Sequence, residues 1–398
     1  MHPAYGQLIE KAQASHDQGR RLDLFDDQDI DLARLYSYAF RTHTIGAFHA
    51  TRQELATLAV ADPLAAAHVQ RAIEHLEDLA NQGMEPPRAD ARAVIWSCYH
   101  YDRHVRRSVD ALEQALATSN EPALSTIHER FVQSMSQITG GNGIYLTRDT
   151  EAPPQASFIV PNLGITIVPL VYGDHHSWNL AHLNEQHLDV PMHRHRHGVE
   201  IHLGFAPLEG YMVLGNCKAH VDEGYAMPIP PMTRHGWANT TGKIHHVPFI
   251  FGSLKQSGWG VFLDVEAQGV PLEDLRTVER TSWHMGSSVY LQRQIAAMAK
   301  LSAARRQTLV PAASMDRDGS GGLELSGSRV TESGLELPLA GFRIVSVVGG
   351  RGQVRIGDVC QNVGPHDHFG VPAGMRAHLK QDGTEPMVVL DALIKGVG

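Results

Sequence analysis

The stretch "PMHRHRHGVEIHLGF", residues 191–205, decides how the rest of the chain is interpreted. Alternate positions carry imidazoles, and a carboxylate and one more imidazole follow closely: His193, His195, His197, Glu200 and His202. In an extended strand, residues two apart point to the same face, so the first three histidines share one side. This stripe predicts a metal site, and one strand alone rarely completes such a site. A further ligand is therefore expected from another strand.

The second stretch that bears on this site is "EGYAMPIPPMTRHGWAN", residues 223–239. Here Gly224 is followed after five residues by Pro230, then by His235 and Asn239. This order resembles the second conserved motif of the cupin superfamily. The family's first motif, His-x-His followed by Glu, is similar to the pattern of the first stretch. The region from about 157 to 265 is therefore expected to be cupin-like, with Met232 standing where the family usually has Gly.

The resemblance implies a divalent metal with two adjacent open positions for substrate, water or oxygen. The implied ligands are His193, His195, Glu200 and His235. Because one carboxylate among imidazoles shifts the preference toward iron or manganese, Fe(II) is the expected metal, with Mn, Ni or Zn as alternatives. A shift by two residues gives a rival set with the same spacing. Its members are His195, His197, His202 and His235.

Other side chains near the two motifs are expected to line the pocket. The predicted substrate-binding residues are Tyr172, Trp178, His182 and Trp237. No catalytic residue is assigned. Arg194 and Arg196 alternate with the histidines, so they are expected to face away from the metal as a solvated or interface-facing pair.

The pattern of residue types along the chain predicts an N-terminal helical domain followed by two β regions. Residues 1–140 form the expected helical domain, in which Asp62 is an expected N-cap. Short runs rich in Val, Ile, Phe and Tyr between turn residues then predict a cupin barrel with the metal site over 141–280. A helical connection and linker is expected over 281–330, and a second, degenerate cupin barrel over 331–398. The expected fold class is α+β, a helical domain followed by two jelly-roll barrels.

The second β region has the same order of parts as the first, which indicates a divergent internal duplication. Its segment "VGPHDHFGVPAGMRAHL" resembles the second cupin motif, but Ala377 occupies the position of the last His, and no His-x-His precedes it. This half is expected to keep the barrel without the metal.

The amino-acid composition restricts the kinds of binding partner that are expected. The 398 residues carry a formal net charge of −9 with no long Lys/Arg run, which argues against nucleic-acid or membrane binding. No apolar run reaches the length of a membrane span, and the N-terminus has no apolar signal core. A cytoplasmic homo-oligomer, a homodimer by analogy with cupins, is expected.

Many cupins with this ligand set are dioxygenases, so the resemblance implies an Fe(II) oxidoreductase. Its expected partners are O2 and a small chelating substrate of the catechol, keto acid or diketone type. One alternative is a redox-neutral isomerase, epimerase or lyase of a sugar or keto acid, in which the metal polarises a carbonyl. Another is a module in which the metal only anchors a ligand.

Overall fold

The computed structural model describes most of the chain. The described residues are 3–82, 91–118, 125, 129, 144–148, 158–160, 163, 165–173, 175–183, 189–205, 210–220, 224–239, 245–256, 265–279 and 289–396. The predicted domain boundaries near residues 140 and 280 lie outside these ranges. No helix within the ranges is both long and apolar enough to cross a bilayer.

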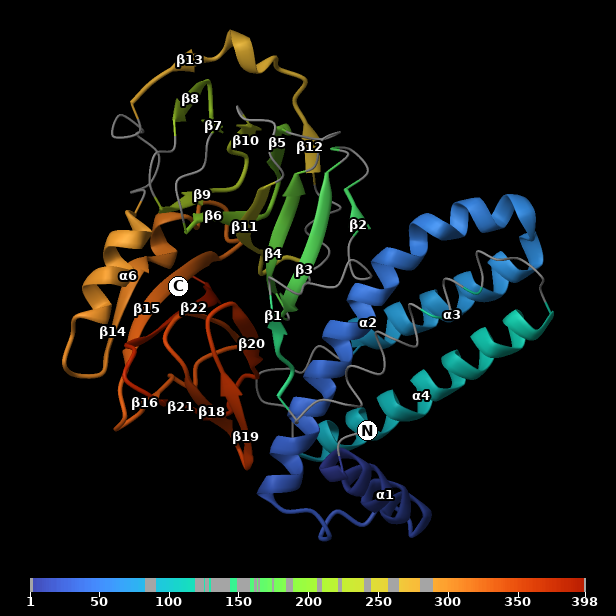
Figure 1. Cartoon of the computed structure of the whole chain (residues 1–398). Helices are drawn as coiled ribbons and strands as arrows, with labels where there is room; N and C mark the ends of the chain where they lie inside the picture. The colour runs from blue at the N-terminus through green and yellow to red at the C-terminus, as the bar shows by residue number, and fades with distance from the viewer. Residues whose placement is uncertain are drawn as a thin grey trace.

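Four helices form the N-terminal part: α1 (Pro3–Asp17), α2 (Asp27–Ala61), α3 (Pro63–Gln82) and α4 (Ala91–Thr118). The Asp62 carboxylate accepts a hydrogen bond from the Ala65 amide at 2.9 Å, as expected of an N-cap. The helices share a core of buried apolar side chains that includes Tyr36, Leu58 and Ile95. In Figure 1 these helices lie to one side of the β-strands, and α2 passes alongside the strands before it extends away from them.

The first barrel, called barrel 1, has two six-stranded sheets. One sheet has the order β12-β5-β10-β7-β8-β13 and the other β2-β3-β4-β11-β6-β9. Their strands are β2 (Phe158–Ile159), β3 (Thr166–Tyr172), β4 (His176–Leu183), β5 (Val190–His195), β6 (Val199–Gly204), β7 (Gly210–Leu214), β8 (Cys217–His220), β9 (Tyr225–Ile229), β10 (His235–Asn239), β11 (His245–Gly252), β12 (Val265–Ala267) and β13 (Arg276–Thr277). From β4 onward the chain passes repeatedly between the two sheets, which is the jelly-roll course expected of a cupin.

The second barrel, called barrel 2, repeats this course. Its sheets have the orders β1-β20-β17-β22-β15-β14 and β16-β21-β18-β19. Its strands are β14 (Arg305–Val310), β15 (Gly322–Val330), β16 (Leu335–Glu336), β17 (Arg343–Gly349), β18 (Gly352–Ile356), β19 (Val359–Val363), β20 (Asp367–Val371), β21 (Ala377–Gln381) and β22 (Met387–Lys395), with β1 (Thr147–Arg148) at one edge. The expected α+β fold, a helical domain followed by two jelly-roll barrels, is confirmed.

Barrel 2 begins earlier than the sequence indicated. Residues 281–330 were expected to be a helical connection and linker, but the helix α6 spans only Leu291–Ala299, and β14 and β15 both belong to barrel 2. The small residues of β15 gave it the composition of a loop. In the structure they permit close packing, because a side chain at Gly322 would collide with the carbonyl of Ala312.

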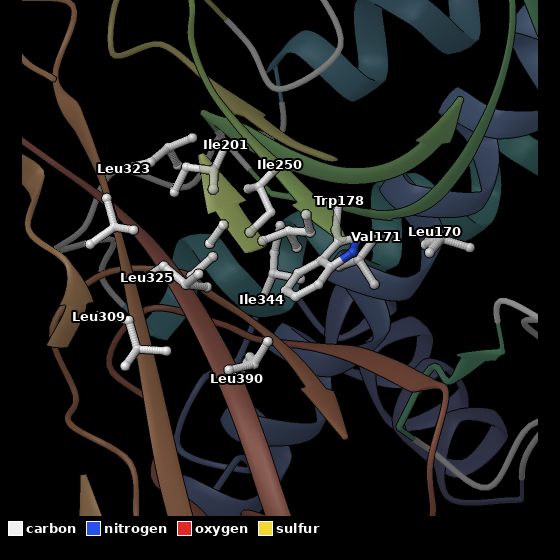
Figure 2. Packing of buried hydrophobic residues seen from close by; sticks show 14 of the residues in the cluster. Leu170, Val171, Trp178, Ile201, Ile250, Leu309, Leu323, Leu325, Ile344 and Leu390 are labelled. Carbon is white, nitrogen blue, oxygen red and sulfur yellow. The ribbon is translucent and has the colours of Figure 1, made fainter. Parts of the chain in front are cut away.

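The two barrels pack through one buried apolar cluster. Figure 2 shows Trp178 and Ile250 of barrel 1 together with Ile344 and Leu390 of barrel 2 within this cluster. We call it the inter-barrel cluster. Its members come from both barrels, so neither barrel buries all of its apolar surface alone.

The barrels also exchange edge segments. Strand β1, which precedes barrel 1 in the chain, pairs with β20 of barrel 2. Val289, which precedes barrel 2, forms a β-bridge with Ala226 on β9 of barrel 1. Each barrel therefore receives an edge contact from the segment of chain that leads into the other.

Candidate metal centre

Three strands of barrel 1 bring four potential ligands together. His193 and His195 project from β5, Glu200 from β6, and His235 begins β10, directly opposite His193 in the antiparallel pair. All four side chains are buried, with at most 6% of any residue exposed. One ligand atom from each lies within 4.8 Å of the other three. It is the one such cluster of three or more metal-ligating side chains within the described ranges.

The Glu200 carboxylate lies close to two of the three histidines. Glu200 Oε2 is 2.8 Å from His235 Nε2 and 3.5 Å from His195 Nε2. The imidazole rings of His193 and His235 are 4.1 Å apart between centroids. Glu200 Oε2 and His235 Nε2 are buried and, despite their proximity, neither makes a hydrogen bond of acceptable geometry within the described part of the chain. Buried polar atoms without a hydrogen bond are costly unless an ion or a ligand satisfies them.

Backbone carbonyls orient two of the imidazoles. His193 Nδ1 lies 2.8 Å from the Pro191 carbonyl oxygen, and His235 Nδ1 lies 2.9 Å from that of Thr233. A ring that donates from Nδ1 presents the lone pair of Nε2, which is the arrangement found in metal-binding histidines. The residues present therefore fit a divalent metal.

Burial and neighbouring charge also favour metal binding. Burial lowers the pKa of His193 well below its usual value, and the adjacent His235 and His195 lower it further, so the imidazole stays neutral. Burial alone raises the pKa of Glu200, but His202 and His235 outweigh it and hold that pKa well below its usual range. A neutral imidazole and an ionised carboxylate are the forms that ligate a metal.

The rival ligand set is not brought together. His197 lies beyond the end of β5 with 43% of its side chain exposed, and its Nδ1 is 3.3 Å from Asp318 Oδ2. His202 is buried beside the cluster, but its Nε2 lies 2.7 Å from Glu200 Oε1. The structure therefore favours Glu200 over His202 as the fourth candidate ligand.

The four expected substrate-binding residues do not share one environment. Tyr172 and Trp237 are buried in the core of barrel 1. Trp178 instead belongs to the inter-barrel cluster (Figure 2), and His182 lies against His246, with 4.7 Å between ring centroids. The expectation that Trp178 and His182 line the metal pocket is therefore wrong.

The alternation of β4 explains this outcome. The even-numbered Trp178 and Leu180 belong to the inter-barrel cluster, whereas the odd-numbered Ala181 belongs to the core of barrel 1. The side chains of Ser177 and Asn179 share the face of Ala181. These two polar residues were not among the expected substrate-binding residues, because the sequence does not determine which face of β4 points into barrel 1. An error of one residue in the register exchanges the two faces of a strand.

Arg194 and Arg196 face away from the cluster, as strand alternation predicts. Both form ion pairs with Glu266 on β12, and the Arg194 Nη2 to Glu266 Oε2 distance is 2.7 Å. Hydrogen bonds from these two arginines lower the pKa of Glu266.

Strand pairing identifies the positions of barrel 2 that correspond to the candidate ligands. The hairpins β7-β8 and β18-β19 have the same two-residue turn, so Leu214 and Ile356 are equivalent. Their partners in the next strand are His235 and Ala377. Ala377 therefore stands where barrel 1 has a histidine.

The other three positions have also changed. Pairing through β9 and β20 makes Arg343 the equivalent of Glu200. Backbone hydrogen bonds across the turn before His235, and across the matching turn before Ala377, make Leu337 the equivalent of His193 and Leu339 the equivalent of His195. The expectation that barrel 2 keeps the shape without the ligands agrees with this register.

An ion-pair network involves the arginine that replaces the glutamate. Asp391 is fully buried and accepts hydrogen bonds from Arg343 and from Arg306, whose Nη2 lies 3.0 Å from Asp391 Oδ2. Arg306 also pairs with Glu324, which accepts a hydrogen bond from Lys395 at 2.6 Å. The network has three cationic groups and two carboxylates, so both carboxylates are paired within the chain.

The turn before His235 contains a backbone conformation that favours glycine. Met232 has φ of 62°, and its amide donates to the His195 carbonyl at 2.7 Å. Gly374 takes the same place in barrel 2, with φ of 78° and a hydrogen bond to the Leu339 carbonyl. The unusual Met of the sequence motif therefore keeps the turn that Gly normally makes.

The strand order and the set of candidate metal ligands found among the described residues define a protein with two jelly-roll barrels, one of which has a candidate metal centre. No protein-family model matches the chain, and no curated protein matches it. Among solved structures, salicylate 1,2-dioxygenase from Pseudoaminobacter salicylatoxidans with gentisate is similar with a TM-score of 0.43 and 12% identity, over 70% of this chain and 96% of that one. A cupin 2 conserved barrel domain protein from Leptotrichia buccalis is similar with a TM-score of 0.36 and 12% identity, over 58% and 89%. Likenesses at this level assign no reaction.

Proposed function

We propose that the protein is a metal-dependent cupin enzyme, an Fe(II) dioxygenase that acts on a small chelating organic substrate such as a catechol, a keto acid or a diketone. The observation that carries the proposal is the buried cluster of His193, His195, Glu200 and His235 in barrel 1. An ion held by these four residues would act as a Lewis acid toward the substrate and oxygen.

Apolar and polar side chains of barrel 1 suit this chemistry. Phe251 packs against His195, with 4.3 Å between ring centroids, and helps to exclude water. Asn179 Nδ2 donates to Ser177 Oγ at 2.8 Å, but Asn179 Oδ1 and Tyr172 Oη are buried without a hydrogen-bond partner among the described residues. These groups are available to hydrogen-bond a small polar substrate.

The test is anaerobic metal analysis followed by oxygen uptake. We expect one equivalent of metal per chain, and oxygen consumption after iron reconstitution with at least one catechol, keto acid or diketone. Anaerobic turnover by a Zn- or Mn-loaded protein would instead support the redox-neutral isomerase or lyase. If metal removal changes neither ligand affinity nor activity, both enzyme proposals fail. The expected homodimer and cytoplasmic location stay predictions.

A further inference from the structure

His202 lies beside the metal-ligating cluster but outside it. It follows Glu200 by two residues on β6, so both side chains face the interior of barrel 1. Its Nε2 lies 2.7 Å from Glu200 Oε1, and only 4% of the residue is exposed. Because an ionised carboxylate can only accept, the His202 nitrogen must carry the proton in this hydrogen bond.

The two oxygens of Glu200 therefore have different surroundings. Oε1 faces His202, whereas Oε2 faces His195 and His235. We propose that His202 is a positioning residue that fixes the Glu200 carboxylate so that Oε2 alone is presented to a metal. This inference rests on the proposed function, because it concerns the same metal centre.

The comparison between barrels supports this role. His202 pairs with Met227 on β9, and the equivalent pair in barrel 2 is Val345 with Phe369. Barrel 2 thus has an apolar residue at the position of His202, and an arginine at the position of Glu200. Barrel 1 therefore has both the carboxylate of Glu200 and the donor His202, whereas barrel 2 has neither at the equivalent positions.

The experiment measures the Co(II) affinity of the full-length protein by competition with a chelator. We expect His202→Phe to bind one equivalent about 10- to 100-fold more weakly, as is usual when a partner of a ligand is lost. His202→Gln can still donate from its amide, so we expect it to recover most of the affinity. His197→Phe and His197→Gln, at an exposed position, are the matched controls and should bind as the wild type does. The visible spectrum of bound Co(II) should change in His202→Phe and not in the controls.

Three results would overturn the inference. Wild-type affinity and spectrum in His202→Phe would show that the hydrogen bond has no role. Equal weakening in His202→Gln and His202→Phe would show that the donor does not matter. Complete loss of the bound equivalent in both, as in His235→Ala, would make His202 a ligand. A wild-type protein that binds no Co(II) would overturn the proposed function itself, so the two failures are distinguishable.

Discussion

The strands that barrel 1 and barrel 2 have in common follow the same order, but the two barrels surround a buried carboxylate in opposite ways. In barrel 1, Glu200 is surrounded by imidazoles, and its charge is suited to an external cation. In barrel 2, Asp391 is paired with the chain's own Arg306 and Arg343. The comparison teaches that this fold fixes where the interior residues lie and leaves their chemistry to the side chains.

The largest expected effect is on metal content and belongs to barrel 1. His235→Ala should reduce the bound metal from one equivalent to roughly a tenth or less, because a buried ligand is lost. Metal analysis of anaerobically purified protein measures this. His197→Ala is the control and should keep the metal; loss of metal there would favour the rival ligand set.

The second effect is on stability and belongs to barrel 2. Asp391→Ala should lower the free energy of unfolding by about 3–5 kcal/mol, because the buried Arg343 loses the carboxylate that accepts its hydrogen bond and the partly buried Arg306 keeps only Glu324. Urea unfolding measures the change. The folded variant should keep its metal content, and a loss below about 1 kcal/mol would show that the network contributes little.

The third effect compares one turn in both barrels. Met232→Gly should stabilise the protein by roughly 1 kcal/mol, and Gly374→Ala should destabilise it by a similar amount, because only glycine adopts positive φ without cost. Thermal unfolding of both variants checks this. A destabilised Met232→Gly would mean that the methionine side chain makes a compensating contact.

The smallest effect concerns a polar contact between the barrels. Burial raises the pKa of Asp318, but hydrogen bonds from Ser320, His197 and Lys255 outweigh it and lower that pKa to about 2. A lowered folded-state pKa contributes stability above the unfolded pKa of about 4, and this is lost as the pH falls toward about 2.

Asp318→Asn should therefore differ from the wild type by at most about 1 kcal/mol above about pH 4, with the difference shrinking below it. The magnitude is small because the contact is partly exposed to solvent. Urea unfolding across this pH range measures it, and a pH-independent difference would contradict the pairing.

The sequence predicted the two barrels and the residues of the cluster because their signals are local. Alternation placed His193 and His195 on one face, and motif spacing pointed to His235. The orientation of Trp178 depends on the register of β4, which one sequence does not determine. The Gly and Ser residues of β15 concealed a strand, because their close packing is visible only in the fold. The position of His202 did carry a signal, since it lies two residues from Glu200 on the same strand.

The exchange of edge segments has a consequence for how this chain could be shortened in evolution. Strand β1 completes an edge of barrel 2, and Val289 bridges an edge strand of barrel 1, so each half depends on chain that lies outside it. A duplicated barrel that lacks metal ligands can be lost from the chain only if the other barrel folds alone. Here deletion of barrel 2 would uncover the inter-barrel cluster around Trp178. The absence of ligands in barrel 2 therefore does not make that half dispensable.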